Sequence, residues 1–324
     1  MKSYNVLILS AGRRVELIKC FKKARERLGI DSTIIAVDIS DTAPAIYFAD
    51  KYYLIPRIGD PKYIDSLINV CNSENIALII PTIDTELLAL MENRAEIENK
   101  TNAKILLSRD EVITICRNKN NTIQFFEKYG FGVPRQITQF DLEKQNYSFP
   151  LFIKPRDGSS SINTFKVNCK EELEFFNKYV NNPIIQEFIL GKEYSIDVFC
   201  DFESNPITIV PRLRMATRSG EISKGMIDKN REIIDEVKRL IEIMKPIGHI
   251  TVQCMKTQKG IKYIEINPRF GGGAPMSIDA GADSCENLYR LLSGEKLNYN
   301  EDYEDKAVFV RFDDSIKLDR NVEI

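Results

Sequence analysis

Over the first hundred residues, short apolar runs alternate with segments whose apolar residues recur every three or four positions. The first run, 5–10, is apolar almost throughout, which is typical of a strand covered on both faces of a parallel sheet. Helical periodicity follows over 15–28, and Gly29 ends that helix. Further strands are predicted at 33–38, 51–55, 77–81 and 103–108, with helices at 61–72 and 87–96. This alternation predicts a doubly wound α/β domain.

The crevice of that domain carries few ligand signals. Its first turn, 10–14, has one glycine, Gly12, where a dinucleotide-binding fingerprint has three. Asp38 ends the second strand, where such a fold holds a ribose, but the missing glycines favour a Rossmann-like domain whose crevice is empty or repurposed. Asp84 and Glu86 could reach a substrate there; we prefer the interpretation that they cap a helix and complement its dipole.

The sequence pattern changes after Arg109. A predicted strand delivers Lys154 to the loop 157–161, Asp-Gly-Ser-Ser-Ser, whose backbone amides and hydroxyls could close over phosphates. The alternative is a solvent-exposed loop between two strands. Glu187 and Glu193 then flank an apolar turn, where they could serve an adenine and a ribose or be ordinary residues of a hairpin.

A polar pair on a later strand suggests a metal site. In the run 263–267, Glu265 and Asn267 alternate with isoleucines and so share one face of the predicted strand. Pro268 ends the strand, and Arg269 follows directly. A carboxylate and an amide beside a guanidinium could together bind Mg²⁺ and a phosphate. An ordinary strand with one solvent-exposed polar face has the same sequence pattern.

Composition excludes several other classes of protein. The 324 residues are 43% hydrophobic, and 45 Lys and Arg against 47 Asp and Glu leave a net charge of −2. No block of like charge suggests nucleic-acid or membrane binding, and the expected location is the cytoplasm. Seven scattered cysteines indicate reduced thiols. One histidine, His249, makes zinc hydrolysis and histidine triads unlikely mechanisms.

The order of these motifs resembles the ATP-grasp superfamily, and the chain is similar to stand-alone proteins built like one synthetase half of the carbamoyl-phosphate synthase large subunit. The resemblance extends from Asn5 to about Gly294. It implies an α/β fold with a Rossmann-like pre-ATP-grasp domain at 1–108. An ATP-grasp domain would follow at 109–300, divided into a lid-bearing part at 109–188 and a metal and substrate part at 189–300, with the tail 301–324 packed on it.

The resemblance also implies individual roles. Lys119 and Lys154 would contact phosphates, and Arg269 would stabilise the transferred phosphoryl group. The implied nucleotide-binding residues are Lys119, Lys154, Asp157, Gly158, Ser159, Ser160, Ser161, Gln186, Glu187, Phe188, Ile189 and Glu193. The implied metal-binding residues are Gln253, Glu265 and Asn267. We expect Gln253 on a strand antiparallel to the metal strand, so that their polar faces meet.

Such a protein would be an ADP-forming, C–N bond-forming ligase that works through an acyl phosphate, with ATP and Mg²⁺ as cofactors and Mn²⁺ as a substitute metal. Its partners would be a small carboxylate and an amine, with a homodimer as a further option. Bicarbonate or carbamate phosphorylation, or a non-catalytic ATP-binding module, are the alternatives. The sequence departs from the family pattern at two places. Asn118 replaces an acid often found before the first lysine, which bears on the placement of Lys119. Gly271–Gly273 replace an arginine and serines, which argues against bicarbonate and carbamate chemistry.

The segment 210–225 concentrates three arginines and a lysine in a nearly neutral chain. We hypothesise that Arg212, Arg214 or Arg218 holds the substrate carboxylate, and we count Arg218 with Lys154 and Arg269 as a catalytic candidate. The alternative is an exposed hairpin with solvated charges.

Overall fold

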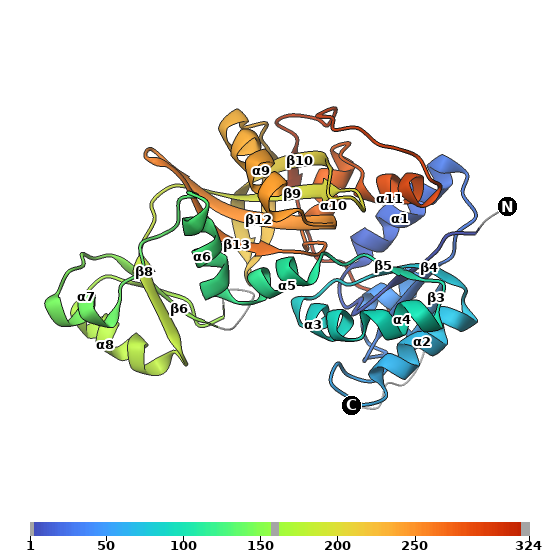
Figure 1. Ribbon diagram of the computed structural model, residues 1–324, viewed down its shortest axis with the longest axis horizontal. Coiled ribbons are helices and arrows are strands. Elements are labelled where there is room, and N and C mark those ends of the chain that lie inside the picture. The colour runs from blue at the N-terminus through green and yellow to red at the C-terminus, as the bar shows by residue number, and fades with distance from the viewer. Residues whose placement is uncertain (1–2, 157–161, 319–324) are drawn as a thin grey trace.

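The computed structural model describes residues 3–156 and 162–318. Within these residues the chain forms three sheets that lie in a row (Figure 1). The N-terminal sheet is at one end, a small lobe is at the other, and a six-stranded sheet joins them. The predicted α/β class, with a parallel-sheet domain at the N-terminal end, is confirmed.

The N-terminal sheet is parallel, with strand order β3-β2-β1-β4-β5. Its strands are β1 (Asn5–Ile8), β2 (Ile34–Asp38), β3 (Lys51–Leu54), β4 (Ile76–Ile80) and β5 (Lys104–Ile105). Its helical segments are α1 (Val15–Leu28), the 3-10 helix η1 (Pro44–Phe48), α2 (Tyr63–Ser73), α3 (Asp84–Glu92) and α4 (Arg94–Lys100). The predicted helix 87–96 is therefore two helices, which meet at Asn93.

Both faces of this sheet are covered at its central strands, which explains why β1, β2 and β4 are almost continuously apolar. In β1, Val6 and Ile8 enter the core beneath α1, whereas Leu7 enters the core beneath α2, α3 and α4. All three side chains are fully buried.

The small lobe carries the three-stranded sheet β7-β6-β8. Its elements are α7 (Gln139–Lys144), β6 (Leu151–Pro155), β7 (Phe165–Val167), α8 (Lys170–Tyr179) and β8 (Pro183–Glu187). The two helices α5 (Asp110–Arg117) and α6 (Lys119–Lys128) lead into it from the N-terminal domain. In the sequence, β6 is followed by residues 157–161, which were predicted to close over phosphates and lie outside the described residues.

The six-stranded sheet has the order β13-β12-β9-β10-β11-β14. Its strands are β9 (Lys192–Cys200), β10 (Pro206–Arg218), β11 (Glu221–Ile227), β12 (Gly248–Thr257), β13 (Gly260–Asn267) and β14 (Val308–Val310). One face is apolar and packs against α9 (Arg231–Met244) and α6, with Ile196 and Val252 fully buried there. Because side chains alternate along a strand, the residues between these apolar positions point to the opposite face.

Two helices join the six-stranded sheet to the N-terminal domain. They are α10 (Ala274–Asp279) and α11 (Ser284–Leu292), and α11 lies against α1 in Figure 1. Phe21 of α1 meets Phe270 and Tyr289 edge to face, with ring centroids 6.1 and 6.0 Å apart. This shared aromatic core holds the two domains together.

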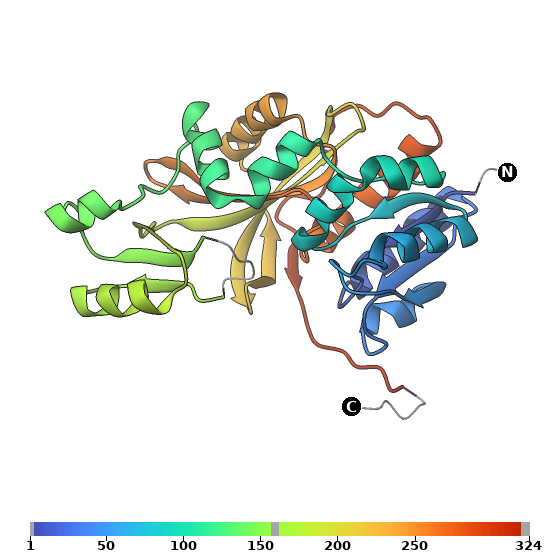
Figure 2. The same cartoon turned by 60° about the horizontal axis from the view of Figure 1, so that its bottom comes forward.

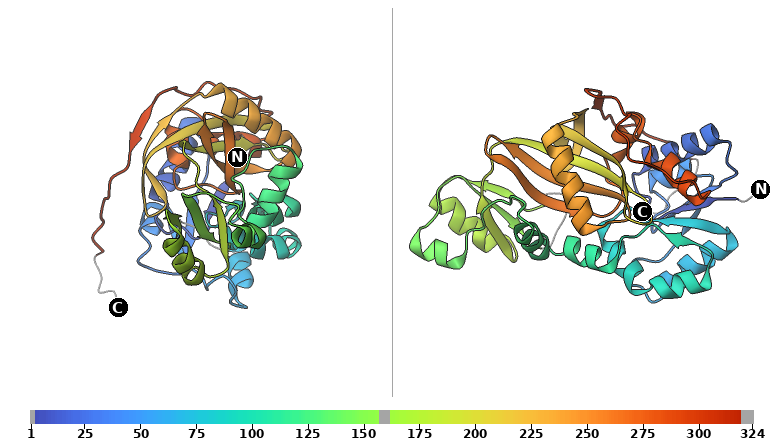
Figure 3. Two further views of the ribbon diagram at one scale, coloured as in Figure 1. Left: turned by 90° about the vertical axis from the view of Figure 1, so that its left-hand side faces the viewer. Right: turned by 45° about the horizontal axis from the view of Figure 1, so that its top comes forward.

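The C-terminal segment returns to the sheet. Its strand β14 pairs antiparallel with β11, and the chain then continues along the side of the molecule (Figures 2 and 3). Among the described residues, no helix combines the length and the apolar character needed to cross a membrane.

Candidate active site

Polar side chains form a continuous stripe across the open face of the six-stranded sheet. The pairing register places Glu265 opposite Gln253 and Gln253 opposite Ser195, while Asn267 lies opposite Thr251. The predicted antiparallel pairing of the Gln253 strand with the Glu265 strand is confirmed. Alternation along the two neighbouring strands β12 and β13 thus gathers the candidate metal ligands, without any contribution from loops.

The three candidate metal ligands converge on one oxygen atom. Gln253 Nε2 and Asn267 Nδ2 both donate to Glu265 Oε1, at 2.8 and 2.9 Å. A carboxylate with two amides fits the hard oxygen donors that Mg²⁺ prefers, because each amide can present its oxygen after rotation of its terminal torsion. In the described parts of the chain no three His, Cys, Asp or Glu side chains gather as a metal site. A magnesium site here would therefore depend on amide oxygens and substrate phosphates.

Lys154 reaches this carboxylate from the small lobe. It is buried, and burial lowers the pKa of its amine from 10.5 to about 8, with Glu265 opposing and Lys119 reinforcing the change. Lys119 begins α6 and donates to the carbonyl oxygen of Pro155, the last residue of β6, at 3.2 Å. The two predicted phosphate-binding lysines thus lie at the same end of β6. The predicted loop residues 157–161 lie outside the described residues.

Asn118 has a structural role that accounts for the missing acid. Its side-chain oxygen caps α6 by accepting from the backbone N–H groups of Asn120 and Asn121, at 2.9 and 3.4 Å. Asparagine is as good an N-cap as aspartate. The departure at this position therefore leaves the placement of Lys119 unchanged.

The predicted adenine-binding segment forms the connection from β8 to β9. Gln186 is buried in β8, and Phe188 and Ile189 are partly exposed in the turn that follows. Glu187 Oε1 accepts from the backbone N–H of Arg135 at 2.9 Å, so this carboxylate ties together two chain segments of the lobe. These residues lie together as a hinge, and their contact with adenine stays a prediction.

Glu193, the predicted ribose acceptor, is paired with Arg214. Arg214 Nε lies 3.0 Å from Glu193 Oε1, and Arg214 Nη1 donates to Ser195 Oγ at 3.3 Å. Burial raises the pKa of Glu193, Arg214 lowers it, and the nearby Glu265 raises it further. Arg214 therefore lies beside the predicted ribose acceptor, whose role stays a prediction.

The two predicted catalytic arginines lie in different surroundings. Arg269 Nη2 donates to Asp84 Oδ2 at 2.7 Å, a contact between the metal strand and the N-terminal domain. Its Nε is buried without a hydrogen-bond partner among the described residues. Arg218 lies in an exposed position at the end of β10 and pairs with Asp313 at 2.6 Å.

Asp84 therefore does not cap a helix, contrary to the preferred interpretation. The N-cap of α3 is Ile83, and no side chain caps it. Glu86 does satisfy helix-end donors, because its carboxylate accepts from the backbone N–H groups of Thr82 and Ile83. Burial raises the pKa of Glu86 to about 7, although Ser10, which donates at 2.5 Å, opposes this rise.

A buried ionic network beside the stripe, on the same face of the sheet, could not be seen in the sequence. Asp197 accepts from Arg212 Nη2 at 2.9 Å and from Ser277 Oγ at 2.6 Å, and all three residues are buried. Burial alone would raise the pKa of Asp197, but Arg212, His249 and Ser277 hold it well below its usual range. Arg212 is therefore a structural cation, and the exposed-hairpin alternative for its segment is wrong at this residue.

The lone histidine belongs to the same network. His249 stacks on Phe270, with ring centroids 4.3 Å apart, and its Nδ1 lies 3.1 Å from Ser284 Oγ. Its Nε2 lies 3.5 Å from Asp197 Oδ1. Its contacts place His249 in the packing between the sheet and α11.

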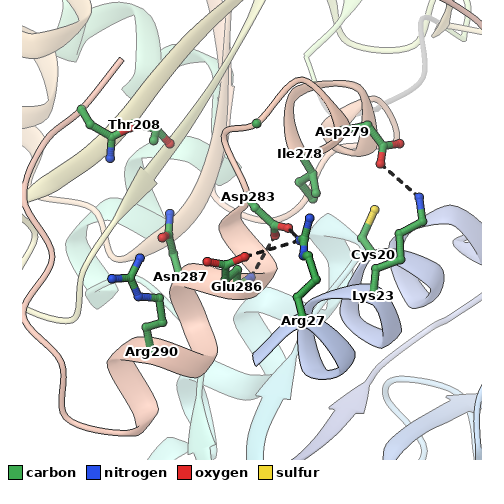
Figure 4. A pocket seen from close by; sticks show the side chains of 12 residues that line it. Cys20, Lys23, Arg27, Thr208, Ile278, Asp279, Asp283, Glu286, Asn287 and Arg290 are labelled. Atoms are coloured by element: carbon green, nitrogen blue, oxygen red, sulfur yellow. Dashed lines mark hydrogen bonds and ion pairs between the residues drawn. The ribbon is translucent and has the colours of Figure 1, made fainter. Parts of the chain in front are cut away.

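A separate cavity of about 400 Å³ opens between α1 and the pair α10 and α11 (Figure 4). It shares no residue with the candidate site. The charged side chains that line it are largely paired: Lys23 with Asp279 at 3.2 Å, and Arg27 with Asp283. We assign it no role in the chemistry.

Comparison with protein families divides the chain in two. Residues 6–105 match the family described as PylC-like, N-terminal domain, and residues 116–273 match the ATP-grasp domain. The D-alanine–D-alanine ligase B of Clostridium perfringens is 26% identical over 57% of this chain and 69% of its own length. The D-alanine–D-alanine ligase of Francisella tularensis subsp. novicida is 25% identical over 49% of this chain, and the match spans only 58% of its length.

Solved structures show the same fold at low identity. N5-carboxyaminoimidazole synthetase from Staphylococcus aureus, complexed with ADP, is 18% identical with a TM-score of 0.76 and covers 95% of this chain and 82% of its own. The biotin carboxylase domain of the Hydrogenobacter thermophilus 2-oxoglutarate carboxylase, in complex with MgADP, is 18% identical with a TM-score of 0.72 and covers 94% of this chain and 73% of its own.

These findings agree with the strand arrangement described above. The predictions of an ATP-grasp enzyme and of ATP with Mg²⁺ as cofactors are confirmed at the level of the family. Residues 116–273 therefore carry an ATP-grasp domain, and residues 6–105 carry a PylC-like N-terminal domain.

Proposed function

We propose that this protein is a ligase that joins a carboxylate to an amine through an acyl phosphate, with conversion of ATP to ADP. The observation that carries the proposal is the convergence of Gln253 and Asn267 on Glu265, with the buried Lys154 close to the same carboxylate. Phosphoryl transfer needs this combination of cations and oxygen ligands rather than a nucleophilic side chain.

The charges are distributed as the transfer requires. Lys119 and Lys154 would bind nucleotide phosphates at the end of β6, and nucleotide binding would protonate the amine of Lys154 fully, because a phosphate stabilises the charged form. Gln253, Glu265 and Asn267 would hold Mg²⁺, which when bound neutralises phosphate charge. Glu193 would accept the ribose hydroxyls after exchanging part of its contact with Arg214.

The reaction proceeds in two displacements. A carboxylate oxygen of the first substrate attacks the γ-phosphorus, the bond to the β-phosphate oxygen breaks, and ADP leaves. The amine then attacks the carbonyl carbon, the nitrogen loses a proton, the bond to the phosphate oxygen breaks, and inorganic phosphate leaves. Arg269, held by Asp84, carries an unpaired buried Nε donor that could stabilise charge on the transferred group.

The test is ADP release from the full chain with ATP and Mg²⁺ over a panel of acids and amines, with and without hydroxylamine. We expect ADP release that depends on the acid, and hydroxamate formation when hydroxylamine replaces the amine, because hydroxylamine traps acyl phosphates. Glu265→Gln should abolish both, whereas Glu295→Gln, an exposed glutamate paired with Arg290, should change neither.

The alternatives give different results in the same assay. A non-catalytic nucleotide-binding module would bind ATP but release no ADP with any acid. A carbamoyl-phosphate-like enzyme would release ADP with bicarbonate and with no larger acid. ADP release without hydroxamate formation would contradict the acyl-phosphate route.

A further inference from the structure

Arg14 occupies a position that its own helix does not favour. It is the N-cap of α1, where Ser, Thr, Asp or Asn is preferred, and its side chain makes no capping hydrogen bond. A cation at this end of a helix also faces the positive pole of the helix dipole. Instead of capping the helix, the Arg14 guanidinium extends to the six-stranded sheet, where its Nη1 lies 3.5 Å from Glu221 Oε1. A residue that breaks a local rule in this way is a candidate for a binding role.

The C-terminal segment delivers a second arginine to the same place. β14 pairs with β11, and the backbone N–H of Arg311 then donates to the carbonyl oxygen of Ser223 at 2.8 Å. This fixes Arg311 so that its Nη1 lies 3.0 Å from Glu221 Oε2. One carboxylate therefore stands between two guanidiniums that come from opposite ends of the chain.

Positive charge exceeds negative charge around Arg14, Glu221 and Arg311. Burial is the main cause that lowers the pKa of Arg14, and Arg269, Arg311 and Arg13 lower it further, against the opposing effect of Glu221. Arg269 is already neutralised by Asp84. The side chains of Arg14, Glu221 and Arg311 are 18, 32 and 36% exposed, so an incoming anion can still reach them.

The triple glycine lies against the same side chains. A Cβ on Gly272 would lie 2.5 Å from Arg14 Nη1 and 2.9 Å from Glu221 Oε1, and a Cβ on Gly273 would clash with Arg212. Any larger residue would push these charged groups aside. Arg212 Nη1 is itself buried without a hydrogen-bond partner among the described residues. Only glycine lets the backbone approach the charged cluster this closely.

We propose that Arg14, Glu221 and Arg311 form the subsite for the amine substrate and that this substrate is an amino acid. Its carboxylate binds the two guanidiniums, and its ammonium group binds Glu221, so that the zwitterion matches the two cations and one anion of the subsite. The ammonium group then loses a proton to solvent, and the free amine attacks the acyl phosphate. The nearby Arg269 links this subsite to the phosphoryl end of the site. The inference rests on the ligase function proposed above.

The experiment measures ADP release with ATP, Mg²⁺ and the acid panel while the amine is varied. Each standard L-amino acid is compared with its decarboxylated amine. In parallel, the shift in thermal midpoint that each amino acid causes is measured in the presence of ADP and Mg²⁺. Arg14→Gln, Arg311→Gln and Glu221→Gln are compared with Arg290→Gln, which removes a partly exposed arginine paired with Glu295 outside the site.

We expect activity with at least one amino acid and little with its decarboxylated amine. Arg14→Gln and Arg311→Gln should each raise the KM for the amino acid by about 10- to 100-fold, the loss of one charge-assisted hydrogen bond, and leave the KM for ATP unchanged. Glu221→Gln, which keeps the shape of the side chain, should act in the same direction. Arg290→Gln should behave as wild type.

The failures of the two proposals can be distinguished. Equal activity with the amino acid and its decarboxylated amine, or unchanged KM values in all three variants, overturns the subsite and leaves the ligase standing. An amino-acid-dependent thermal shift that Arg14→Gln removes, without ADP release for any acid, supports the subsite and contradicts the ligase. Absence of both amino-acid-dependent ADP release and a thermal shift overturns the subsite.

Discussion

Nucleotide affinity should fall as the pH rises through 8, because Lys154 must be charged to bind a phosphate. Burial lowers the pKa of its amine from 10.5 to about 8 in the free protein, although Glu265 opposes this. A bound phosphate stabilises the charged form and returns the pKa toward its ordinary value. Binding therefore takes up a proton in the window from about 8 to 10.5, and affinity is lost across that window.

The size of this pH effect follows from two pKa values of the Lys154 amine, about 8 in the free protein and 10.5 as its ordinary value. The difference of about 2.5 pH units corresponds to a cost of about 3 kcal/mol for charging Lys154 in the folded, nucleotide-free protein. The charged fraction is about 90% at pH 7 and about 10% at pH 9. ADP affinity should fall about fivefold between pH 8 and pH 9 and about sevenfold between pH 9 and pH 10, and the decline should level off as the pH passes about 10.5.

Titration calorimetry with MgADP at a series of pH values above 7.5 measures this directly. The nucleotide itself changes charge below that range, because the second pKa of a phosphate is about 6. Lys154→Arg is the matched control, since an arginine stays charged throughout and should give a nearly flat profile. A flat wild-type profile, or an equal slope in Lys154→Arg, would refute the reasoning.

Three further predictions concern stability and turnover. Lys154→Met should raise the free energy of unfolding at pH 7 by about 1 to 3 kcal/mol, because the wild-type protein keeps a buried amine charged below pH 8. In urea unfolding, this gain should vanish as the pH rises from 8 toward 10.5. Equal stabilities of variant and wild type at pH 7 would contradict the prediction. Asp197→Asn should lower the free energy of unfolding by about 3 to 5 kcal/mol, because it leaves Arg212 charged and buried without its ionic partner. A loss below about 1 kcal/mol in the same urea assay would be inconsistent with a buried Asp197–Arg212 ion pair. Asp84→Asn should lower the kcat for ADP release roughly tenfold, because it releases Arg269 from its charged partner. Steady-state kinetics measure this effect. An unchanged kcat would mean that Asp84 does not position Arg269.

Much of the fold was predictable because burial on two faces leaves a clear pattern. The central strands β1, β2 and β4 are apolar almost throughout, and their positions agree with the structure, whereas the edge strand β3 is largely exposed. The helix Lys170–Tyr179 leaves a weaker signal, because Phe175 and Tyr179 are more than half exposed, so its apolar positions do not mark the buried face. The break at Asn93 has neither glycine nor proline to announce it.

The candidate site was predictable only where a strand supplies it. The two-residue period places Glu265 and Asn267 on one face, and the pairing register then adds Gln253. The pairs formed by Asp84 and Arg14 with distant partners span 185 and 207 residues, and no local pattern indicates them. One signal was available for Arg14, since an arginine at a helix N-cap contradicts local preference.

The central claim is that the polar stripe holds the metal and phosphates for an acid-dependent ligation. Glu265→Ala tests it most directly, with three measurements on the same variant: ADP release with the acid and amine panel, Mn²⁺ binding by electron paramagnetic resonance in the presence of ADP, and the thermal midpoint. We predict that the variant loses ADP release and Mn²⁺ binding while its thermal midpoint stays close to that of the wild type. Undiminished ADP release in a folded Glu265→Ala protein would contradict the account.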